Sequence, residues 1–313
     1  MNKLQVFLLI VLSCFIVLFI KYNFKPDIFT PISNPLITTP KETKIMLVGD
    51  VMLGRSVMTK SLALKDPLYA FRNVKDGLIG NDIIFANLEA PFVENCPITN
   101  SGMTFCAPPD LVQALTYAGI NVVNLANNHI LNYGMEGLKS TQKILGENQI
   151  LYTGVNNLAI KEVNNIKFGF LGFDLVDNKF TASDQKLISE SKNKTDVLIV
   201  SVHWGSEYQA TASVEQKRVA REMVNSGADI IVGHHPHWVQ DSVCIERTGS
   251  KLINPSGCVP VFYSLGNFVF DQMWSEETKK GLAVKLIYSG MKLVNQEQLP
   301  VYIPNPGQPE FVQ

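Results

Sequence analysis

The stretch Ile45-Met-Leu-Val-Gly-Asp50 sets the pattern that decides the fold, because a run of apolar and small residues leads straight into a carboxylate. A run with no polar face is typical of a central strand covered on both sides. Similar runs recur at residues 83–86, 122–125, 168–173, 197–202, 230–232 and 261–265. Helices are expected between them, near residues 110–118, 137–148 and 214–226, the last with a capping-box pattern of Ser213 and Gln216. Strands that alternate with helices predict a layered α/β domain.

Residue types that bind metals follow these predicted strands. They are Asp50, Glu89, Asn128, His203, His234, His235 and His237, and His129 comes directly after Asn128. Every histidine of the chain stands in one of these segments. Parallel strands end at one edge of a sheet, so these side chains are expected to converge there. Taken singly, each histidine fits a hydrogen-bonded structural role better, but taken together they predict a metal centre.

The predicted ligand set combines carboxylate, amide and imidazole groups and contains no thiolate. This combination suits divalent Mn, Fe, Zn or Co rather than Cu(I). A shared carboxylate can bridge two ions, so we expect two divalent ions. Such a pair lowers the pKa of a trapped water towards about 7 and stabilises charge on transferring oxygens.

Six segments carry a resemblance to a known family. They are GDVMLGR (49–55), ANLEAPF (86–92), ANNHILNYG (126–134), HWGSEY (203–208), GHHPHWVQ (233–240) and YSLGNFVFDQ (263–272). In this order they resemble the CapA-type poly-γ-glutamate capsule synthesis proteins of the calcineurin-like metallophosphoesterase superfamily. The resemblance extends over residues 44–293 and implies a four-layer α/β/β/α sandwich with a dinuclear site at the sheet edge.

The resemblance also assigns roles to individual residues. It implies that Asp50, Glu89, Asn128, His203 and His237 are metal ligands, with His234 or His235 as a further one. It implies that His129 is the acid that protonates the leaving group.

Two segments depart from the wider superfamily. The usual opening Asp-x-His is here Asp50-Val51-Met52, so one imidazole ligand is missing. The usual aspartate of the second motif is replaced by the segment Asn87-Leu-Glu89. Both departures are shared with the CapA-type proteins, and they leave the occupancy of one metal position and phosphatase activity open.

Other residues of these motifs have two interpretations each. Arg55 suits an anionic substrate because its planar guanidinium matches phosphate or carboxylate, but it could equally be a surface charge. Trp204 and Tyr208 could line the floor of the site or belong to the core. Asp271 is expected to be structural rather than catalytic.

The N-terminus differs from the rest of the chain. The apolar run over residues 4–20 spans roughly 25 Å as a helix, against about 30 Å of bilayer hydrocarbon. We interpret residues 1–21 as an uncleaved signal anchor, a single transmembrane helix, with a cleaved signal peptide as the alternative. A Pro/Thr-rich linker is expected over residues 22–41, the globular domain over 42–299 and an irregular Pro-rich tail over 300–313. Within the domain, residues 282–294 predict a hairpin.

Cysteine positions bear on the compartment. Local pairing would join Cys96 to Cys106 and Cys244 to Cys258, which suits an oxidising environment; four reduced thiols are the alternative. The formal net charge of −1 argues against nucleic-acid binding through a basic surface. We expect a single-pass protein of the cell membrane with its globular domain outside the cytoplasm, although the lysines that flank the apolar run do not fix its orientation.

These features lead to two functional hypotheses. In the first, a metal-dependent hydrolase acts in synthesis, release or export of an anionic envelope polymer, by resemblance poly-γ-glutamate, with His129 as acid and Arg55 steadying charge. In the second, the chain is a non-catalytic assembly subunit of a synthetase complex whose metal site is structural or binds polymer carboxylates. The expected partners are the polymer or its precursor, the membrane and other capsule synthesis subunits.

Overall fold

The computed structural model describes residues 2–23, 41–247 and 257–312, and the chain divides into two compact units, 1–39 and 40–313. The apolar N-terminal run forms helix α1 (Lys3–Asn23). Across the three described ranges, no helix is both long and apolar enough to cross a membrane. The transmembrane helix expected over residues 1–21 is therefore not supported. Residues 24–40, most of the expected linker, lie outside the described residues.

The second unit is built around two β-sheets. In the first sheet, the order is β14 (Gln308–Phe311), β13 (Lys292–Asn305), β12 (Lys280–Ser289), β1 (Glu42–Val51), β2 (Ile83–Leu88), β3 (Val122–Asn124) and β4 (Leu151–Thr153), and β11 (Asn267–Val269) pairs with β1. In the second, the order is β5 (Leu158–Val163), β6 (Ile166–Asp174), β7 (Val197–His203), β8 (Ile230–His234), β10 (Val259–Phe262) and β9 (Ser242–Ile245). The pairs β1–β2, β2–β3, β6–β7 and β7–β8 are parallel, as expected for strands joined through helices.

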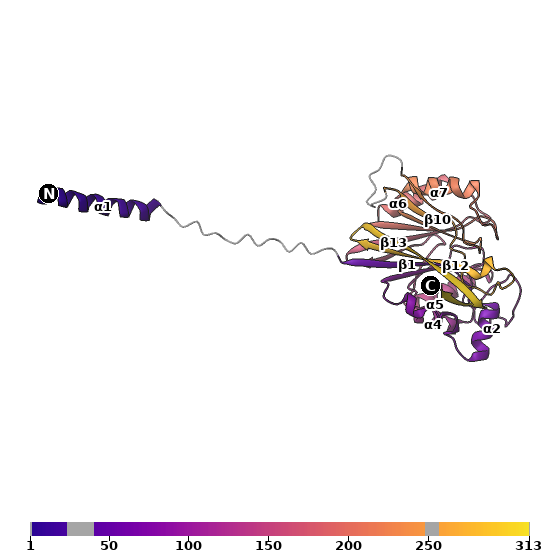
Figure 1. Ribbon diagram of the computed structural model, residues 1–313. Coiled ribbons are helices and arrows are strands. Elements are labelled where there is room, and N and C mark those ends of the chain that lie inside the picture. Colours follow the sequence, from indigo (N-terminus) through magenta and orange to yellow (C-terminus); the bar gives the residue numbers. More distant parts are fainter. Residues whose placement is uncertain (1, 24–40, 248–256, 313) are drawn as a thin grey trace. The chain divides into compact units, whose positions relative to one another are not determined.

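Helices cover the outer face of each sheet (Figure 1). On the first sheet lie α2 (Arg55–Leu64), α4 (Val112–Tyr117) and α5 (Gly134–Glu147), and on the second lie α6 (Ala182–Lys192) and α7 (Val214–Ser226). Shorter helices complete the connections: α3 (Lys75–Leu78), η1 (Tyr69–Phe71), η2 (Pro109–Leu111) and η3 (Glu277–Lys279).

Alternate side chains of β1 pack into two different hydrophobic clusters. Met46 and Val48 pack in the cluster beneath the helices, whereas Ile45 and Leu47 pack in the cluster between the two sheets. Successive side chains of a strand point to opposite faces, so a strand between two apolar layers needs apolar residues at every position. The predicted four-layer α/β/β/α arrangement is confirmed.

The C-terminal segment corrects one expectation. Residues 300–313 were expected to form an irregular tail, but residues 300–305 continue β13 and residues 308–311 form β14. Val301 and Ile303 alternate along β13 and are buried. Burial of these side chains outweighs the prolines, which occur in the part of the sheet nearest its edge. The predicted hairpin is present as β12 and β13.

Both local disulfides are formed. Cys96 is bonded to Cys106, and Cys244 is bonded to Cys258. The first closes a loop that follows β2, and the second lies beside the antiparallel pair β9–β10. Each cross-link restricts the unfolded chain, which stabilises these irregular segments.

Candidate metal centre

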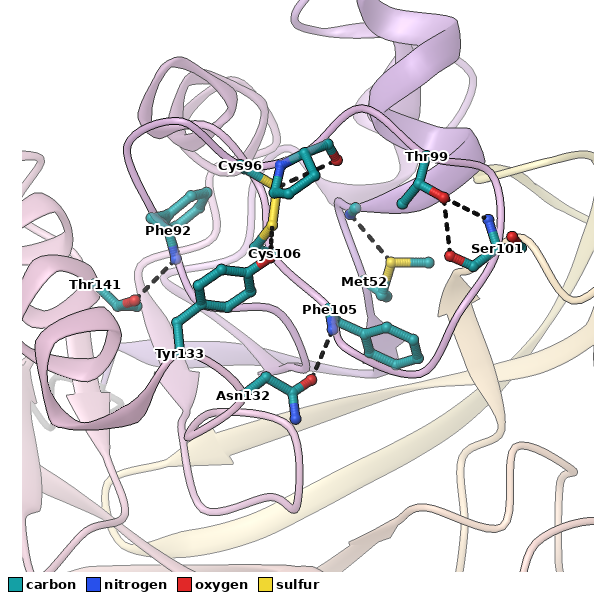
Figure 2. The surroundings of a disulfide bond; sticks show 12 residues. Met52, Phe92, Cys96, Thr99, Ser101, Phe105, Cys106, Asn132, Tyr133 and Thr141 are labelled. Carbon is teal, nitrogen blue, oxygen red and sulfur yellow. Dashed lines mark hydrogen bonds between the residues drawn. A yellow bond between two sulfur atoms is a disulfide. The ribbon is translucent and has the colours of Figure 1, made fainter.

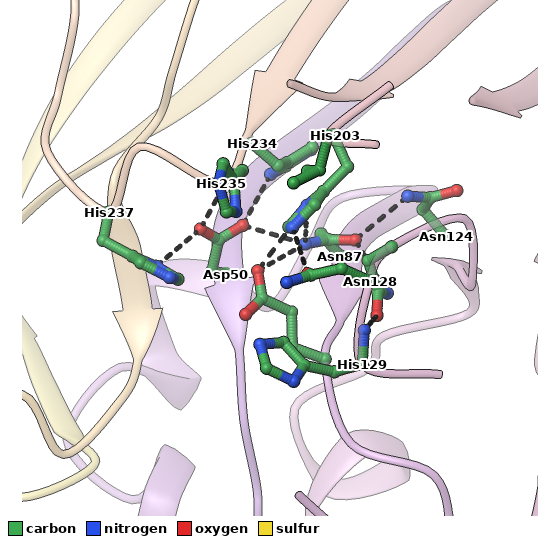
Figure 3. Close-up of polar contacts among 12 residues, drawn as sticks. Asp50, Asn87, Asn124, Asn128, His129, His203, His234, His235 and His237 are labelled. Atoms are coloured by element: carbon green, nitrogen blue, oxygen red, sulfur yellow. Dashed lines mark hydrogen bonds and ion pairs between the residues drawn. The ribbon is translucent and has the colours of Figure 1, made fainter. Parts of the chain in front are cut away.

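The polar residues predicted from the strand ends meet in one place (Figure 3). Asp50 lies at the end of β1, Glu89 directly after β2, and Asn128 and His129 in the loop after β3. His203 ends β7 and His234 ends β8, with His235 and His237 in the loop that follows. The two sheets contribute from opposite sides, so the centre lies where the carboxyl ends of both sets of strands meet.

Asp50 is the hub of the cluster and is fully buried. Its Oδ1 lies 3.0 Å from His234 Nδ1 and accepts a hydrogen bond of 2.9 Å from the side-chain amide of Asn87. Its Oδ2 accepts from the backbone N–H of His235 at 3.3 Å and lies 3.2 Å from His237 Nδ1. Each carboxylate oxygen therefore faces two nitrogen groups.

Asn87 joins Asp50 to the other side of the cluster. Its NH₂ group lies 2.9 Å from Asp50 Oδ1, 2.9 Å from Glu89 Oε1 and 3.2 Å from His203 Nδ1. Its Oδ1 accepts from Asn124 at 3.0 Å, which fixes the amide orientation. Asp50, Glu89 and His203 thus each direct an acceptor atom at the Asn87 NH₂ group, which has only two hydrogens to donate.

Burial and mutual charge change the acidity of these groups. Burial alone would raise the pKa of Asp50, but its hydrogen bonds with His234 and His237 hold that pKa well below its ordinary value. Burial, followed by the charge of Asp50, raises the pKa of Glu89 well above its usual range. Burial lowers the pKa of His203 strongly and that of His235 to about 4. These two imidazoles are therefore neutral near pH 7, which is the form that binds metals.

Buried atoms that lack partners show that the cluster suits a cation. Among the described residues, Glu89 Oε2, His234 Nε2 and His235 Nδ1 are buried and have no hydrogen-bond partner. Such an unsatisfied polar atom costs about 1–3 kcal/mol, so its presence needs a reason. A carboxylate and neutral imidazoles are the donors that divalent Mn, Fe, Zn and Co accept. The donor set therefore fits the predicted metal ions.

Two groups of side chains bring ligand atoms within 4.8 Å of one another. One consists of Asp50, Glu89 and His203, and we call it the inner group. The other consists of Glu207, His235 and His237, and we call it the outer group. Asn128 adjoins the inner group, since its Oδ1 lies 3.0 Å from His203 Nε2.

The loop after β8 has an unusual backbone. His235 and His237 have φ values of 91° and 58°, in the region that side chains other than glycine rarely adopt. Strain of this kind costs on the order of 1–3 kcal/mol and persists only where the surroundings enforce it. Here the hydrogen bonds of His235 and His237 to Asp50 hold the loop, and both imidazoles remain in the cluster.

His129 lies beside the cluster (Figure 3). The two residues that support it, Phe105 and Asn132, lie near the first disulfide (Figure 2). The His129 ring stacks on Phe105 with centroids 3.9 Å apart, and its Nδ1 lies 3.1 Å from Asn132 Oδ1. The same oxygen accepts from the backbone N–H of Phe105 at 2.6 Å. Phe105 precedes Cys106, so the first disulfide holds the ring that positions His129. Burial lowers the pKa of His129 to about 4, against the opposing effect of the Asn132 hydrogen bond.

Arg55 is placed near the cluster but is held by other groups. Its guanidinium forms an ion pair with Asp271 and donates to the carbonyl oxygen of Gly102 at 3.0 Å. It also lies over Phe105, 4.6 Å from the ring centroid. Asp271 accepts from the backbone N–H of Ser56 at 3.0 Å as well. Asp271 thus anchors the start of α2, consistent with the structural role expected for it.

The two aromatic residues of the HWGSEY segment have different positions. Trp204 is buried, donates from Nε1 to the carbonyl oxygen of Tyr263 at 2.8 Å and belongs to the core. Tyr208 lies nearer the centre, with its ring 6.3 Å from that of His237 and 4.7 Å from that of Trp274. Trp274 is largely exposed, so these rings lie between the cluster and solvent.

A comparison with family models matches residues 44–272 to the bacterial capsule synthesis protein PGA_cap. The chain belongs to the PGA_cap family. The matched range contains every candidate ligand as well as His129 and Arg55. The family resemblance seen in the sequence is therefore confirmed.

Individual relatives agree with this assignment. The chain is 34% identical to the capsule biosynthesis protein CapA of Bacillus anthracis, over 75% of this chain and 62% of that protein. It is 32% identical to the PGA biosynthesis protein CapA of Bacillus subtilis strain 168, over 75% of this chain and 65% of that protein. The chain thus spans less than two thirds of either relative.

One solved structure resembles this PGA_cap chain in its fold. It is a hypothetical protein from Thermus thermophilus, with a TM-score of 0.50 and 14% sequence identity. The similarity covers 84% of this chain and 100% of that one. At this identity the likeness extends to the fold alone.

Sequence reasoning did not predict the contacts that three residues make in the candidate centre of this PGA_cap chain. Asn87 was noted only as an amide beside Glu89, yet it touches both carboxylates. Asn267 orients His237, since its Oδ1 lies 3.0 Å from His237 Nδ1. Glu207 was not considered, although an acidic residue four positions after a strand-end histidine is a signal that could have identified it.

Proposed function

We propose that this PGA_cap chain is a metal-dependent hydrolase that acts on an anionic envelope polymer or its precursor, in the synthesis or export of poly-γ-glutamate. The observation that carries the proposal is the pair of ligand groups around Asp50, with buried atoms of Glu89, His234 and His235 that lack partners among the described residues. The capsule and PGA biosynthesis names of the two Bacillus proteins support the polymer.

Divalent ions, when bound by these residues, would activate a water and stabilise negative charge on the reacting oxygens. The cluster itself supplies the pre-organisation, because Asp50, Glu89 and His203 are held by hydrogen bonds through Asn87 before any substrate arrives. Groups that are already oriented need no rearrangement when charge develops.

His129 is the residue we assign to proton transfer. Asn132 Oδ1 already accepts from the backbone N–H of Phe105, so it also accepts from His129 and places a proton on Nδ1. Because burial lowers the pKa of His129 to about 4, the ring is neutral near pH 7 and Nε2 holds a lone pair, so His129 would have to take up a proton there before it gives one to a leaving group. Stacking on Phe105 fixes the plane of the ring.

Arg55 has a secondary role in this proposal. Two of its nitrogens are engaged by Asp271 and Gly102, and its Nε is buried without a partner among the described residues. Its charge therefore acts on the site through space. This engagement also favours the second candidate, an assembly subunit whose metal centre binds polymer carboxylates without turnover.

Replacing His129 with alanine separates the two candidates. If His129 is the acid, His129→Ala lowers turnover of phosphoester or γ-glutamyl substrates by about 10²–10⁴-fold and leaves the metal content unchanged. Turnover by the purified chain and metal content by elemental analysis are measured on the same samples. Gln113→Ala, an exposed change on α4, is the control. No turnover by the parent chain favours the assembly subunit, whereas unchanged turnover in His129→Ala would show that His129 is not the acid.

We also propose that the globular unit works outside the cytoplasm, attached through its N-terminal segment. The two disulfides support an oxidising compartment, and the apolar surface of α1 supports attachment.

The proposed location can be tested with intact spheroplasts, by protease digestion and cysteine alkylation from outside the cell. Protease added from outside should digest the globular unit, and Cys96 and Cys106 should resist alkylation until a reductant is added. A cytoplasmic protein serves as the protected control. Protection of the globular unit from the protease would contradict the location.

A further inference from the structure

We propose that Glu207 is the ligand that completes a second, outer cation position together with His235 and His237, in place of the imidazole that the opening segment lacks. This inference rests on the metal centre of the proposed function and adds a residue that the sequence did not suggest. It also makes the two positions chemically unequal.

Met52 cannot supply that ligand. Its side chain is buried in the core beneath the helices, and its sulfur accepts from the backbone N–H of Gly54 at 3.1 Å. A thioether is in any case a soft ligand that suits Cu(I) better than Mn, Fe, Zn or Co. An ion near His235 and His237 therefore needs another donor.

The chain brings Glu207 to these histidines through two loops that are bonded to each other. The backbone N–H of Trp204 donates to the carbonyl oxygen of His234 at 3.1 Å, and that of Tyr208 donates to Pro236 at 2.8 Å. Gly205 and Tyr208 have φ values of 83° and 60°, which turn the loop after β7 back on itself. Glu207 is consequently held against the loop after β8.

The hydrogen-bond partners of His237 Nδ1 leave the other ring nitrogen, Nε2, facing Glu207. The amide of Asn267 donates to Gln272 at 3.1 Å and to the carbonyl oxygen of Thr278 at 2.9 Å, so its Oδ1 is an acceptor. His237 Nδ1 lies 3.0 Å from that oxygen and 3.2 Å from Asp50 Oδ2, both acceptors, and so carries the proton. The lone pair is then on Nε2.

His237 Nε2 lies 4.0 Å from Glu207 Oε1. This distance is too long for a hydrogen bond, but it is suitable for two donors that each lie about 2.1 Å from one shared ion. His235 supplies a third donor within 4.8 Å of both, and its buried Nδ1 has no partner among the described residues. The buried Nδ1 of His235 thus lacks a hydrogen-bond partner among the described residues, and the Glu207 carboxylate and the lone pair of His237 Nε2 lie close to this imidazole. This combination points to a cation.

The two groups differ in access to solvent. Asp50, Glu89 and His203 are each 0% exposed, whereas the Glu207 side chain is 29% exposed. The outer ion is therefore the one expected to exchange readily, and Glu207 supplies the outer group's negative charge. Loss of that charge should weaken the outer position far more than the inner one, because Glu207 is not part of the inner group.

The test is titration of the metal-free, full-length chain with Mn²⁺, followed by electron paramagnetic resonance and elemental analysis. We expect the parent to bind two ions per chain with a spin-coupled spectrum. Glu207→Gln, which keeps the shape and removes the charge, should bind one ion with an uncoupled six-line spectrum and an outer Kd raised at least about 100-fold. Glu190→Gln, an exposed change on α6, is the matched control and should behave as the parent.

Each other result has a distinct meaning. If Glu207→Gln binds two ions with the parent's affinity, the role of Glu207 is overturned and the proposed metal centre stands. If the parent binds no Mn²⁺, the metal centre itself is overturned. If the parent binds a single ion, or if Glu207→Gln binds none while its circular dichroism and unfolding temperature match the parent's, a separate outer position is overturned.

Discussion

Asp50→Asn is expected to abolish metal binding and the turnover that depends on it. Each oxygen of Asp50 faces two nitrogen groups, contributed by His234, His235, His237 and Asn87. An asparagine replaces one acceptor oxygen with a donor, which would face donors already in place. It also removes the charge that both ligand groups adjoin. A variant of nearly identical volume should therefore lose the whole centre.

Thermal unfolding measures this loss without an activity assay. A cation at 100 times its Kd stabilises the folded chain by about 2.7 kcal/mol. For a domain of this size, that corresponds to a rise of about 5–10 °C in the unfolding temperature. We expect this rise in the parent and in Asp177→Asn, an exposed control, and none in Asp50→Asn.

Without metal, Asp50→Asn should also unfold somewhat earlier than the parent, because unsatisfied donors cost about 1–3 kcal/mol. Two Mn²⁺ ions bound per chain of Asp50→Asn, at the parent's affinity, would show that Asp50 is not the hub.

Gly233→Ala is expected to have the largest effect on stability. A Cβ at Gly233 would lie 2.0 Å from the carbonyl oxygen of Tyr263 and 2.6 Å from Trp204 Nε1. Those two atoms are hydrogen-bonded to each other at 2.8 Å, so neither can move away alone. Overpacking of this kind costs about 3 kcal/mol or more when backbone must shift.

The loss should appear as an unfolding temperature lower by about 6–12 °C, measured by calorimetry. Metal affinity should fall as well, because residue 233 directly precedes His234 on β8. Gly146→Ala is the matched control: Gly146 lies in α5, and its added Cβ would meet nothing within 4 Å. Alanine there should stabilise the chain by about 0.5–1 kcal/mol. Equal effects of the two substitutions would contradict the close approach of β8 to Tyr263.

Part of the centre could be predicted from the sequence because its signals are local. His203 and His234 end β7 and β8, and Asp50 is the residue before the last of β1; parallel strands place such ends at one edge. The capping box of Ser213 and Gln216 on α7 was likewise visible, and both of its hydrogen bonds are present.

Other contacts join segments far apart in the chain and had no local signal. From the sequence, Arg55 could bind an anionic substrate or lie on the surface. In the structure it forms an ion pair with Asp271, which is over two hundred residues away in the chain. Glu207 and His237 meet only because the loops after β7 and β8 are hydrogen-bonded to each other. The prolines after residue 300 suggested a tail, yet Val301 and Ile303 are buried and the pairing of β13 with β12 and β14 makes that segment part of the first sheet.

The sequence by itself determined the family, the layered α/β class and most of the residues of the candidate metal centre, because hydrophobic runs and the residues that follow them are visible along the chain. Tertiary structure decided the division into inner and outer groups, the support of His129 by a disulfide loop and the engagement of Arg55. The physical reason is that hydrogen bonding, burial and distance between side chains depend on where two sheets and their loops meet, which no single segment specifies.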